Sequence, residues 1–128
     1  MAYNVLIVDD SRTMRRVIQK CITLSGFAVE KFWEAGDGKE ALAILRAREV
    51  DLIVSDLNMP EMNGIEMLKE MKKDERLGQI PVLFITTLGQ EKVMQEAFDL
   101  GVKEYLQKPF HPEALRDVLN RSVGKSLG

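Results

Sequence analysis

The segment Leu52-Ile53-Val54-Ser55-Asp56-Leu57-Asn58-Met59-Pro60 is the stretch from which the fold can be worked out. It begins with apolar, mostly β-branched residues, which are typical of a strand buried on both faces of a sheet. The run ends on Asp56, and a turn closed by Pro60 and Gly64 precedes a helical pattern. Ligands of open α/β sheets bind just beyond the carboxyl ends of the strands, so Asp56 stands where a reacting carboxylate would. A surface acid that merely ends a strand is the alternative.

Strand and helix patterns alternate on both sides of this segment, with short connections rich in Gly and Asp. Strands are expected over residues 5–8, 27–33, 52–55, 81–86 and 105–106. A helix is predicted after each strand, with apolar faces that begin at Met14, Ala41, Ile65, Val93 and Leu115. The alternation predicts an α/β fold, a doubly wound sheet of five parallel strands with helices on both faces and right-handed crossovers.

Length and composition are those of one globular domain. With 128 residues, of which 45% are hydrophobic, the chain can form a substantial core, and a single domain is expected over residues 1–128. The net charge of −2, with acids and bases interspersed, gives no electrostatic footprint for nucleic acid or for an anionic membrane. No apolar run is long enough to span a bilayer and no signal peptide is recognisable, so a cytoplasmic location is expected.

Polar residues lie at the ends of the expected strands. Asp9 and Asp10 follow the first strand, Asp56 the third and Lys108 the fifth, and Thr86 ends the fourth. Parallel strands bring these groups to one edge of the sheet. Close carboxylates repel one another until a proton or a cation binds, and an all-oxygen site with open positions favours Mg²⁺. A metal, an ammonium group and a hydroxyl around one carboxylate predict a phosphoryl-transfer site with an aspartate nucleophile.

With these residues in place, the chain resembles the receiver domain of two-component response regulators, and in particular the single-domain chemotaxis (CheY-like) type. The resemblance covers essentially the whole chain and rests on Asp9-Asp10, Asp56, Asn58-Met59-Pro60, Gly64, Thr86, Tyr105 and Lys108-Pro109-Phe110. It implies a flavodoxin-like sheet of strand order 2-1-3-4-5, of which CheY is a known example, and no effector domain. It also implies a signalling domain in a phosphorelay rather than an enzyme with an external substrate.

The resemblance implies a role for each residue near the expected site. Asp56 accepts a phosphoryl group from a histidine kinase. Mg²⁺ is held by Asp10, Asp56 and the backbone carbonyl of Asn58, with Asp9 assisting. Lys108 binds a phosphoryl oxygen, and Thr86 turns its hydroxyl towards the phosphoryl group.

The resemblance also implies a switch and a set of partners. Tyr105 turns inward into the space that Thr86 leaves, and this remodels the face made by the fourth helix, fifth strand and fifth helix. An output protein such as a flagellar motor switch component would bind there, and a phosphatase is a further expected partner. The chain is expected to be a monomer, and the Lys108–Pro109 peptide is expected to be cis.

Several positions depart from the family pattern. Thr87 stands where a very small residue is usual, which would narrow access to Asp56. Asn58 and Leu88 are expected to flank the path of the hydrolytic water and so to control dephosphorylation, with the bulk of Leu88 slowing it. The second strand and its loop, residues 28–36, look long for the family, and irregularity is expected near Trp33.

Other interpretations remain. An aspartate-nucleophile, Mg²⁺-dependent phosphatase of the haloacid dehalogenase type needs an acid two residues after its nucleophile, but Ser11 follows Asp9 and Asn58 follows Asp56. A receiver that serves as a phosphate sink or relay stays open. Residues 36–41 loosely match a dinucleotide-binding fingerprint but are expected to form a turn. The arginines of the first helix are expected to form a solvated face that could also contact a kinase; they are Arg12, Arg15 and Arg16.

Overall fold

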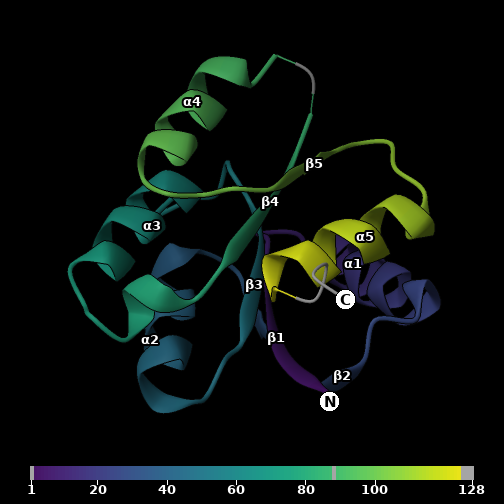
Figure 1. Ribbon diagram of the computed structural model, residues 1–128. Helices are drawn as coiled ribbons and strands as arrows, with labels where there is room; N and C mark the ends of the chain where they lie inside the picture. The colour runs from purple at the N-terminus through teal and green to yellow at the C-terminus, as the bar shows by residue number, and fades with distance from the viewer. Residues whose placement is uncertain (1, 88, 125–128) are drawn as a thin grey trace.

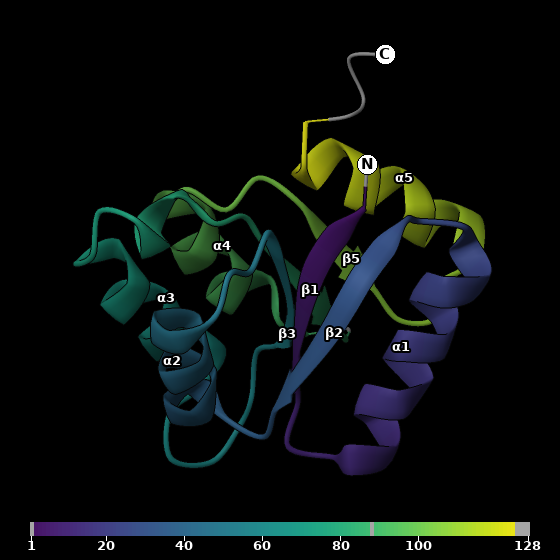
Figure 2. The same cartoon turned by 90° about the horizontal axis from the view of Figure 1, so that it is seen from below.

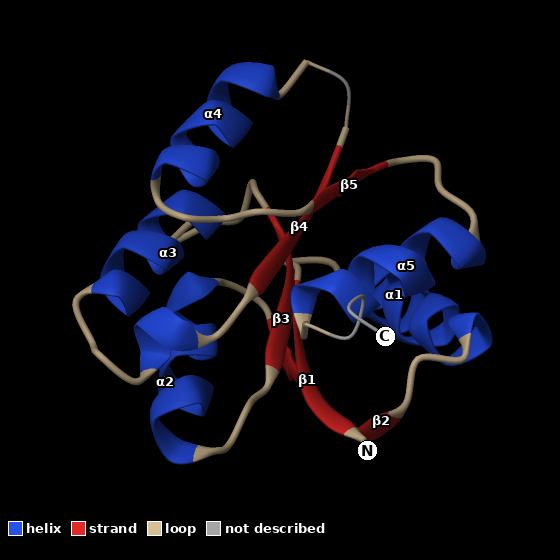
Figure 3. Ribbon diagram, in the orientation of Figure 1, coloured by secondary structure: helices blue, strands red, loops and turns tan. Residues whose placement is uncertain are grey.

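The computed structural model describes residues 2–87 and 89–124. Within them lies one parallel sheet of strand order β2-β1-β3-β4-β5, drawn in red in Figure 3. The strands are β1 (Tyr3–Val8), β2 (Val29–Ala35), β3 (Leu52–Asp56), β4 (Val82–Thr86) and β5 (Tyr105–Gln107). The helices are α1 (Arg12–Ser25), α2 (Gly38–Ala47), α3 (Gly64–Lys72), α4 (Glu91–Asp99) and α5 (Pro112–Ser122), with a short 3₁₀ helix at Leu77–Gln79. The predicted flavodoxin-like α/β fold and its strand order are confirmed.

The helices cover both faces of the sheet. Helices α2, α3 and α4 lie on one face, and α1 and α5 lie on the other, as the two perpendicular views show (Figures 1 and 2). Each face has its own apolar core, since alternate residues of a strand point to opposite sides. In β3, Ile53 packs with the α2–α4 cluster, whereas Leu52 and Val54 pack with the α1–α5 cluster. All three side chains are fully buried, so the strand is buried on both faces, as predicted.

Side-chain caps start the first three helices on the carboxyl side of the sheet. The Ser11 hydroxyl accepts a hydrogen bond from the Met14 N–H and starts α1. The Asp37 carboxylate accepts one from the Glu40 N–H and starts α2. Asn63 and Glu66 form a reciprocal capping box that starts α3. These caps fix where α1, α2 and α3 begin beside the carboxyl edge of the sheet.

The second strand differs from its prediction. It spans Val29–Ala35 rather than 27–33, because Phe27 is buried against Tyr3 instead, with ring centroids 5.3 Å apart. Tyr3 pairs with Val29 but Asn4 pairs with Lys31, so the extra residue lies between these pairs, at position 30. The pairing of β1 with β2 is regular at Trp33. The irregularity was expected near Trp33 but lies three residues earlier in the chain. The bulge is at the start of β2, away from the carboxyl edge.

Residues 36–41 form a bend at Gly36 and Asp37 followed by the first turn of α2, and Gly38 packs closely against the loop that follows β3. The Gly38 N–H donates to the Met62 carbonyl at 2.9 Å, and a Cβ at position 38 would lie 2.7 Å from Met62 Cγ. The N-terminus of α2 therefore lies against the loop that follows β3. No helix in residues 2–87 and 89–124 is long and apolar enough to cross a membrane.

Candidate functional site

Three aspartates meet at the carboxyl edge of the sheet. Strands β1 and β3 are neighbours, with Val8 opposite Ser55, so Asp9 and Asp10 emerge beside Asp56. One carboxylate oxygen from each aspartate lies within 4.8 Å of those of the other two. Their surroundings differ, since Asp9 is buried, Asp56 half-buried and Asp10 exposed. The structure thus brings together the acids that the sequence placed at one edge.

Asp9 is held by backbone groups on both sides. Its Oδ1 accepts a hydrogen bond from the Ser11 N–H at 2.8 Å, and its own N–H donates to the Ala35 carbonyl at 3.1 Å. Burial raises the pKa of Asp9, and the neighbouring Asp56 carboxylate raises it further, whereas the Ser11 N–H and the Lys108 charge lower it. A buried carboxylate beside other acids gains stability from a proton or a cation.

Asp56 is oriented by the loop that follows it. Its Oδ1 accepts a hydrogen bond from the Leu57 N–H at 2.8 Å, and the Asn58 N–H lies close enough to lower the pKa of this carboxylate. Burial raises the pKa of Asp56, while these N–H groups and the Lys108 ammonium lower it. The loop itself is anchored where the Gly64 N–H donates to the Leu57 carbonyl at 2.9 Å.

Gly64 is required by the close packing beneath this loop. A Cβ at this position would lie 2.6 Å from Phe84 Cε1 and 2.8 Å from the Asp56 carbonyl oxygen, which is closer than real Cβ contacts allow. The glycine lets α3 begin directly against the backbone of Asp56. Packing at Gly64 therefore fixes where the Asp56 backbone lies.

The donor set at this edge fits a hard divalent cation. Three carboxylates converge within 4.8 Å, and carboxylate oxygens are the ligands that Mg²⁺ prefers. Asn58 lies two residues beyond Asp56 and is exposed in the loop. Its carbonyl remains a predicted ligand.

Thr86 and Lys108 lie at the same edge, on β4 and just beyond β5. Thr86 pairs with Gln107, and the Lys108 N–H donates to the Thr86 carbonyl at 2.8 Å. Thr86 is buried, and the Lys108 charge acts on the carboxylates of both Asp9 and Asp56. The Lys108–Pro109 peptide is cis, as the resemblance implied.

Tyr105 lies on the surface in this structure. Its side chain is 45% exposed and meets Phe98 of α4 edge to face, with ring centroids 5.7 Å apart. A pocket of about 280 Å³ lies between Tyr105 and Thr86, lined by Thr86, Thr87, Gln90, Glu91, Met94, Gln95, Phe98, Tyr105 and Gln107. The inward turn of Tyr105 stays a prediction, and the pocket is a space into which the ring could turn.

Two positions were expected to govern access to Asp56. Thr87 is exposed, and its N–H donates to Gln90 Oε1 at 3.4 Å. Leu88 lies outside the described residues, so its control of dephosphorylation stays a prediction from the sequence alone.

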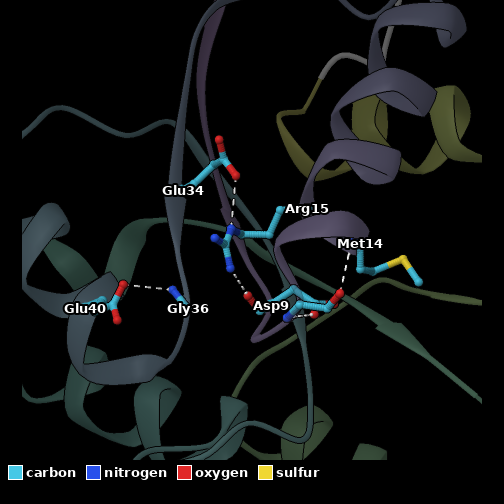
Figure 4. Close-up of polar contacts among 7 residues, drawn as sticks. Asp9, Met14, Arg15, Glu34, Gly36 and Glu40 are labelled. Atoms are coloured by element: carbon cyan, nitrogen blue, oxygen red, sulfur yellow. Dashed lines mark hydrogen bonds and ion pairs between the residues drawn. The ribbon is translucent and has the colours of Figure 1, made fainter.

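Arg15 is a site neighbour that the sequence analysis missed. The expectation that it joins a solvated helix face is wrong, because its side chain is only 16% exposed. Its guanidinium donates to the Asp9 carbonyl at 2.6 Å and pairs with Glu34 of β2 at 3.0 Å (Figure 4). One signal was available: Arg15 precedes the buried Ile18 by three positions, so it lies at the border of the helix face that meets the sheet. Arg12 and Arg16 are exposed, as expected.

The comparisons with known proteins agree with this geometry. The response regulator receiver domain family matches residues 5–120. The chain is 40% identical over 121 residues to chemotaxis protein CheY1 of Helicobacter pylori, covering 94% of this chain and 96% of that protein. It is 40% identical over 117 residues to chemotaxis protein CheY-3 of Vibrio cholerae, covering 91% of this chain and 88% of that protein.

A solved structure gives the same result. The chemotaxis response regulator CheY4 of Vibrio cholerae is 36% identical, with a TM-score of 0.79 over 95% of this chain and 99% of that one. The fold, the aspartate cluster and these relatives point the same way, and the chain belongs to the response regulator receiver domain family of phosphorelay signalling.

Proposed function

We propose that this chain is a stand-alone receiver that accepts a phosphoryl group on Asp56 and passes the signal to a partner protein. The observation that carries the proposal is the convergence of Asp9, Asp10 and Asp56 within 4.8 Å at the edge of the sheet, with the Lys108 charge acting on this cluster. The near-complete coverage of CheY1 supports a receiver that works as a single domain over residues 1–128.

The transfer that we propose needs little covalent chemistry from the protein. An Asp56 carboxylate oxygen forms a bond to phosphorus while the phosphorus–nitrogen bond of a kinase phosphohistidine breaks, and the imidazole leaves with the bonding electrons. The N–H group of Leu57 holds the Asp56 carboxylate in one orientation for this step. Lys108 supplies a positive charge to a phosphoryl oxygen, and Thr86 supplies a hydroxyl.

Mg²⁺ is the cofactor that we propose for this site. When bound, it would neutralise charge on the phosphoryl oxygens and orient the donor. Asp10, Asp56 and the Asn58 carbonyl are the proposed ligands, with Asp9 assisting. The repulsion among three close carboxylates supports this assignment, because a cation relieves it.

The proposed output is a change in partner binding on the face of α4, β5 and α5. The similarity to chemotaxis proteins supports a role in flagellar motor control, with a histidine kinase as donor, a motor switch component as output partner and a phosphatase to end the signal. A phosphate sink or relay would use the same site without that output. A cytoplasmic location and a monomeric state remain predictions.

Turnover of an external phosphate ester is not part of the proposal. Aspartate-nucleophile phosphatases place a general acid two residues after the nucleophile, and that position holds Asn58 after Asp56. An amide cannot deliver the proton that a leaving alkoxide needs. The phosphorylated form is therefore expected to decay by slow hydrolysis of its own phosphate.

The experiment is phosphorylation by a small acyl phosphate with Mg²⁺, followed by intact-protein mass spectrometry. One phosphate should appear and be removed by hydroxylamine, which cleaves acyl phosphates. Asp56→Asn should take up none, while Asp117→Asn, at an exposed aspartate of α5, should behave as the parent. Equal labelling of Asp56→Asn and the parent would refute the assignment.

A further inference from the structure

Arg15 joins three elements that meet behind the aspartate cluster. It lies in the first turn of α1, its guanidinium pairs with Glu34 of β2, and the same group donates to the carbonyl of Asp9 at the end of β1 (Figure 4). The distances are 3.0 Å to Glu34 Oε1 and 2.6 Å to the Asp9 oxygen. With both contacts made by a side chain that is 16% exposed, the guanidinium has one well-defined position.

The carbonyl that Arg15 binds belongs to the peptide between the two adjacent aspartates. A peptide unit is planar, so the Asp9 carbonyl and the Asp10 N–H turn together. Rotation about the Asp9 Cα–C bond would turn this unit and displace the Asp10 Cα, and with it the exposed Asp10 carboxylate. The Asp9 side chain is fixed separately, by the Ser11 N–H. Arg15 therefore holds the peptide unit that joins the buried Asp9 to the exposed Asp10.

We propose that Arg15, anchored by Glu34, is a positioning residue that sets the geometry of Asp9 and Asp10 and thereby the affinity of the site for Mg²⁺. This inference rests on the proposed function, in which these aspartates hold the cation. Arg15 touches neither the metal nor the phosphoryl group. It acts through the backbone, as outer-shell partners of metal ligands do.

The positive charge of Arg15 and its orienting role would change the affinity for Mg²⁺ in opposite directions. A cation near an acidic cluster repels Mg²⁺, so its removal would tighten binding if only charge mattered. If Arg15 orients the two aspartates, its removal weakens binding, because the carboxylates lose their arrangement. The sign of the change in Mg²⁺ affinity therefore separates the two explanations.

The test is calorimetric titration with Mg²⁺ alone, without phosphodonor, of the parent and the variants Arg15→Ala and Arg16→Ala. The two substitutions remove the same charge from adjacent positions of α1, but Arg16 is exposed and is the matched control. We expect Arg15→Ala to bind Mg²⁺ about tenfold more weakly, a typical loss for an outer-shell partner. Arg16→Ala should bind as the parent does or slightly more tightly. Equal or tighter binding by Arg15→Ala would overturn the proposal.

Arg15→Lys and Glu34→Ala keep the test decisive if Arg15→Ala fails to fold, and a double variant tests whether the two residues act together. Arg15→Lys retains the charge but loses the planar fork that reaches Glu34 and the Asp9 carbonyl at once, so binding should weaken about threefold. Unchanged affinity in Arg15→Lys would contradict a positioning role. Glu34→Ala should also weaken binding, and the double variant Arg15→Ala/Glu34→Ala should be no weaker than Arg15→Ala alone. If the losses of Mg²⁺ affinity in the two single variants add up in the double variant, Glu34 does not act through Arg15, and the proposed anchoring of Arg15 by Glu34 is overturned.

Failure of the positioning role and failure of the proposed function give different results. If the parent does not bind Mg²⁺, the proposed metal site is wrong, whatever the variants do. If the parent binds and the Arg15 variants bind equally well, only the role of Arg15 is wrong. Amide hydrogen exchange at Ser11, whose N–H donates to Asp9 Oδ1, gives a second readout without Mg²⁺, and we expect it to speed up in Arg15→Ala and not in Arg16→Ala.

Discussion

The carboxyl edge of the sheet and the face formed by α4, β5 and α5 differ in how firmly their functional side chains are held. At the edge, Asp9 is 3% exposed and bonded to the Ser11 N–H, and Asp56 is bonded to the Leu57 N–H. On the face, Tyr105 is 45% exposed and meets another surface aromatic. One region is suited to chemistry that needs fixed geometry, and the other has room to rearrange.

The helix starts show the same contrast. Helices α1, α2 and α3 each have a hydrogen bond to the side chain of the N-cap residue. In the described part of the chain, the N-cap residues of α4 and α5, Gln90 and His111, make no such bond. An N-cap stabilises a helix by about 1 kcal/mol. The helices that position the acids are thus better fixed at their starts than those that border the proposed output face. Thr86, buried between the two regions, could couple them.

The largest effect is expected where packing fixes the edge. Gly64→Ala should lower the free energy of unfolding by about 3 kcal/mol, because its Cβ would overlap the Phe84 ring and the Asp56 carbonyl. Gly78→Ala is the control, since its Cβ would meet nothing closer than 3.5 Å and its effect should stay within about 0.5 kcal/mol. Urea denaturation measures both. Similar values for the two variants would show that the edge is not tightly packed.

The next effect concerns metal binding by the exposed acid of the cluster. Asp10→Asn should weaken Mg²⁺ binding by about tenfold or more, because one of three converging carboxylates is lost. Without divalent cations, the same variant should unfold at a higher urea concentration than the parent, since repulsion is relieved. Calorimetry and urea denaturation in chelator measure the two changes. An unchanged affinity for Mg²⁺ would remove Asp10 from the site.

A smaller effect follows from the raised pKa of Asp9. The folded state keeps the Asp9 proton to a higher pH than the unfolded state does. The contribution of this proton to the free energy of unfolding is therefore fully present below about pH 3.9, the unfolded pKa, and is lost as pH rises through the folded pKa. Asp9→Asn lacks this loss, while its amide oxygen can still accept from the Ser11 N–H. In chelator, the variant should therefore gain stability over the parent as pH rises.

Urea denaturation of Asp9→Asn and the parent between about pH 4 and pH 7 tests this expectation. Saturating Mg²⁺ should reverse the order at neutral pH, because the cation binds the parent, with all three carboxylates, more tightly than the variant and therefore stabilises the parent more. A stability difference that stays constant across this range would contradict a raised pKa at Asp9.

The smallest effect is expected on the surface face. Phe98→Ala removes an edge-to-face contact between two exposed rings and should lower the free energy of unfolding by about 0.5–1 kcal/mol. Mg²⁺ affinity should not change, because Phe98 lies on α4, whereas the acids lie at the ends of β1 and β3. Denaturation and calorimetry on the same samples check both. A large loss of metal affinity would show that the face and the edge form one rigid unit, contrary to the comparison.

Much of the fold could be predicted from local patterns. Alternating strands and helices imply a parallel sheet, and parallel strands bring Asp9, Asp10 and Asp56 to one edge whatever their order. The order 2-1-3-4-5 itself came from the resemblance, since periodicity says nothing about which strands are neighbours. For the same reason, the roles of Asn58 and Tyr105 were implied rather than worked out.

Two features escaped the sequence because they depend on tertiary contacts. The extra residue opposite Tyr3 and Asn4 leaves no mark on the alternation of β2, so the irregularity was placed near Trp33. Arg15 looked like its neighbours on the helix surface, and only the packing of α1 against β2 brings Glu34 within reach. Charged residues at the border of a buried helix face are therefore worth testing as links between elements.

The most direct test of the central claim is to locate the phosphate on the protein. Treatment of the phosphorylated chain with borohydride reduces an acyl phosphate to an alcohol and converts the modified aspartate to homoserine, which peptide mass spectrometry can place. We predict homoserine at position 56 and unmodified aspartate at positions 9 and 10. Homoserine at either of those two positions, with Asp56 unmodified, would contradict the account.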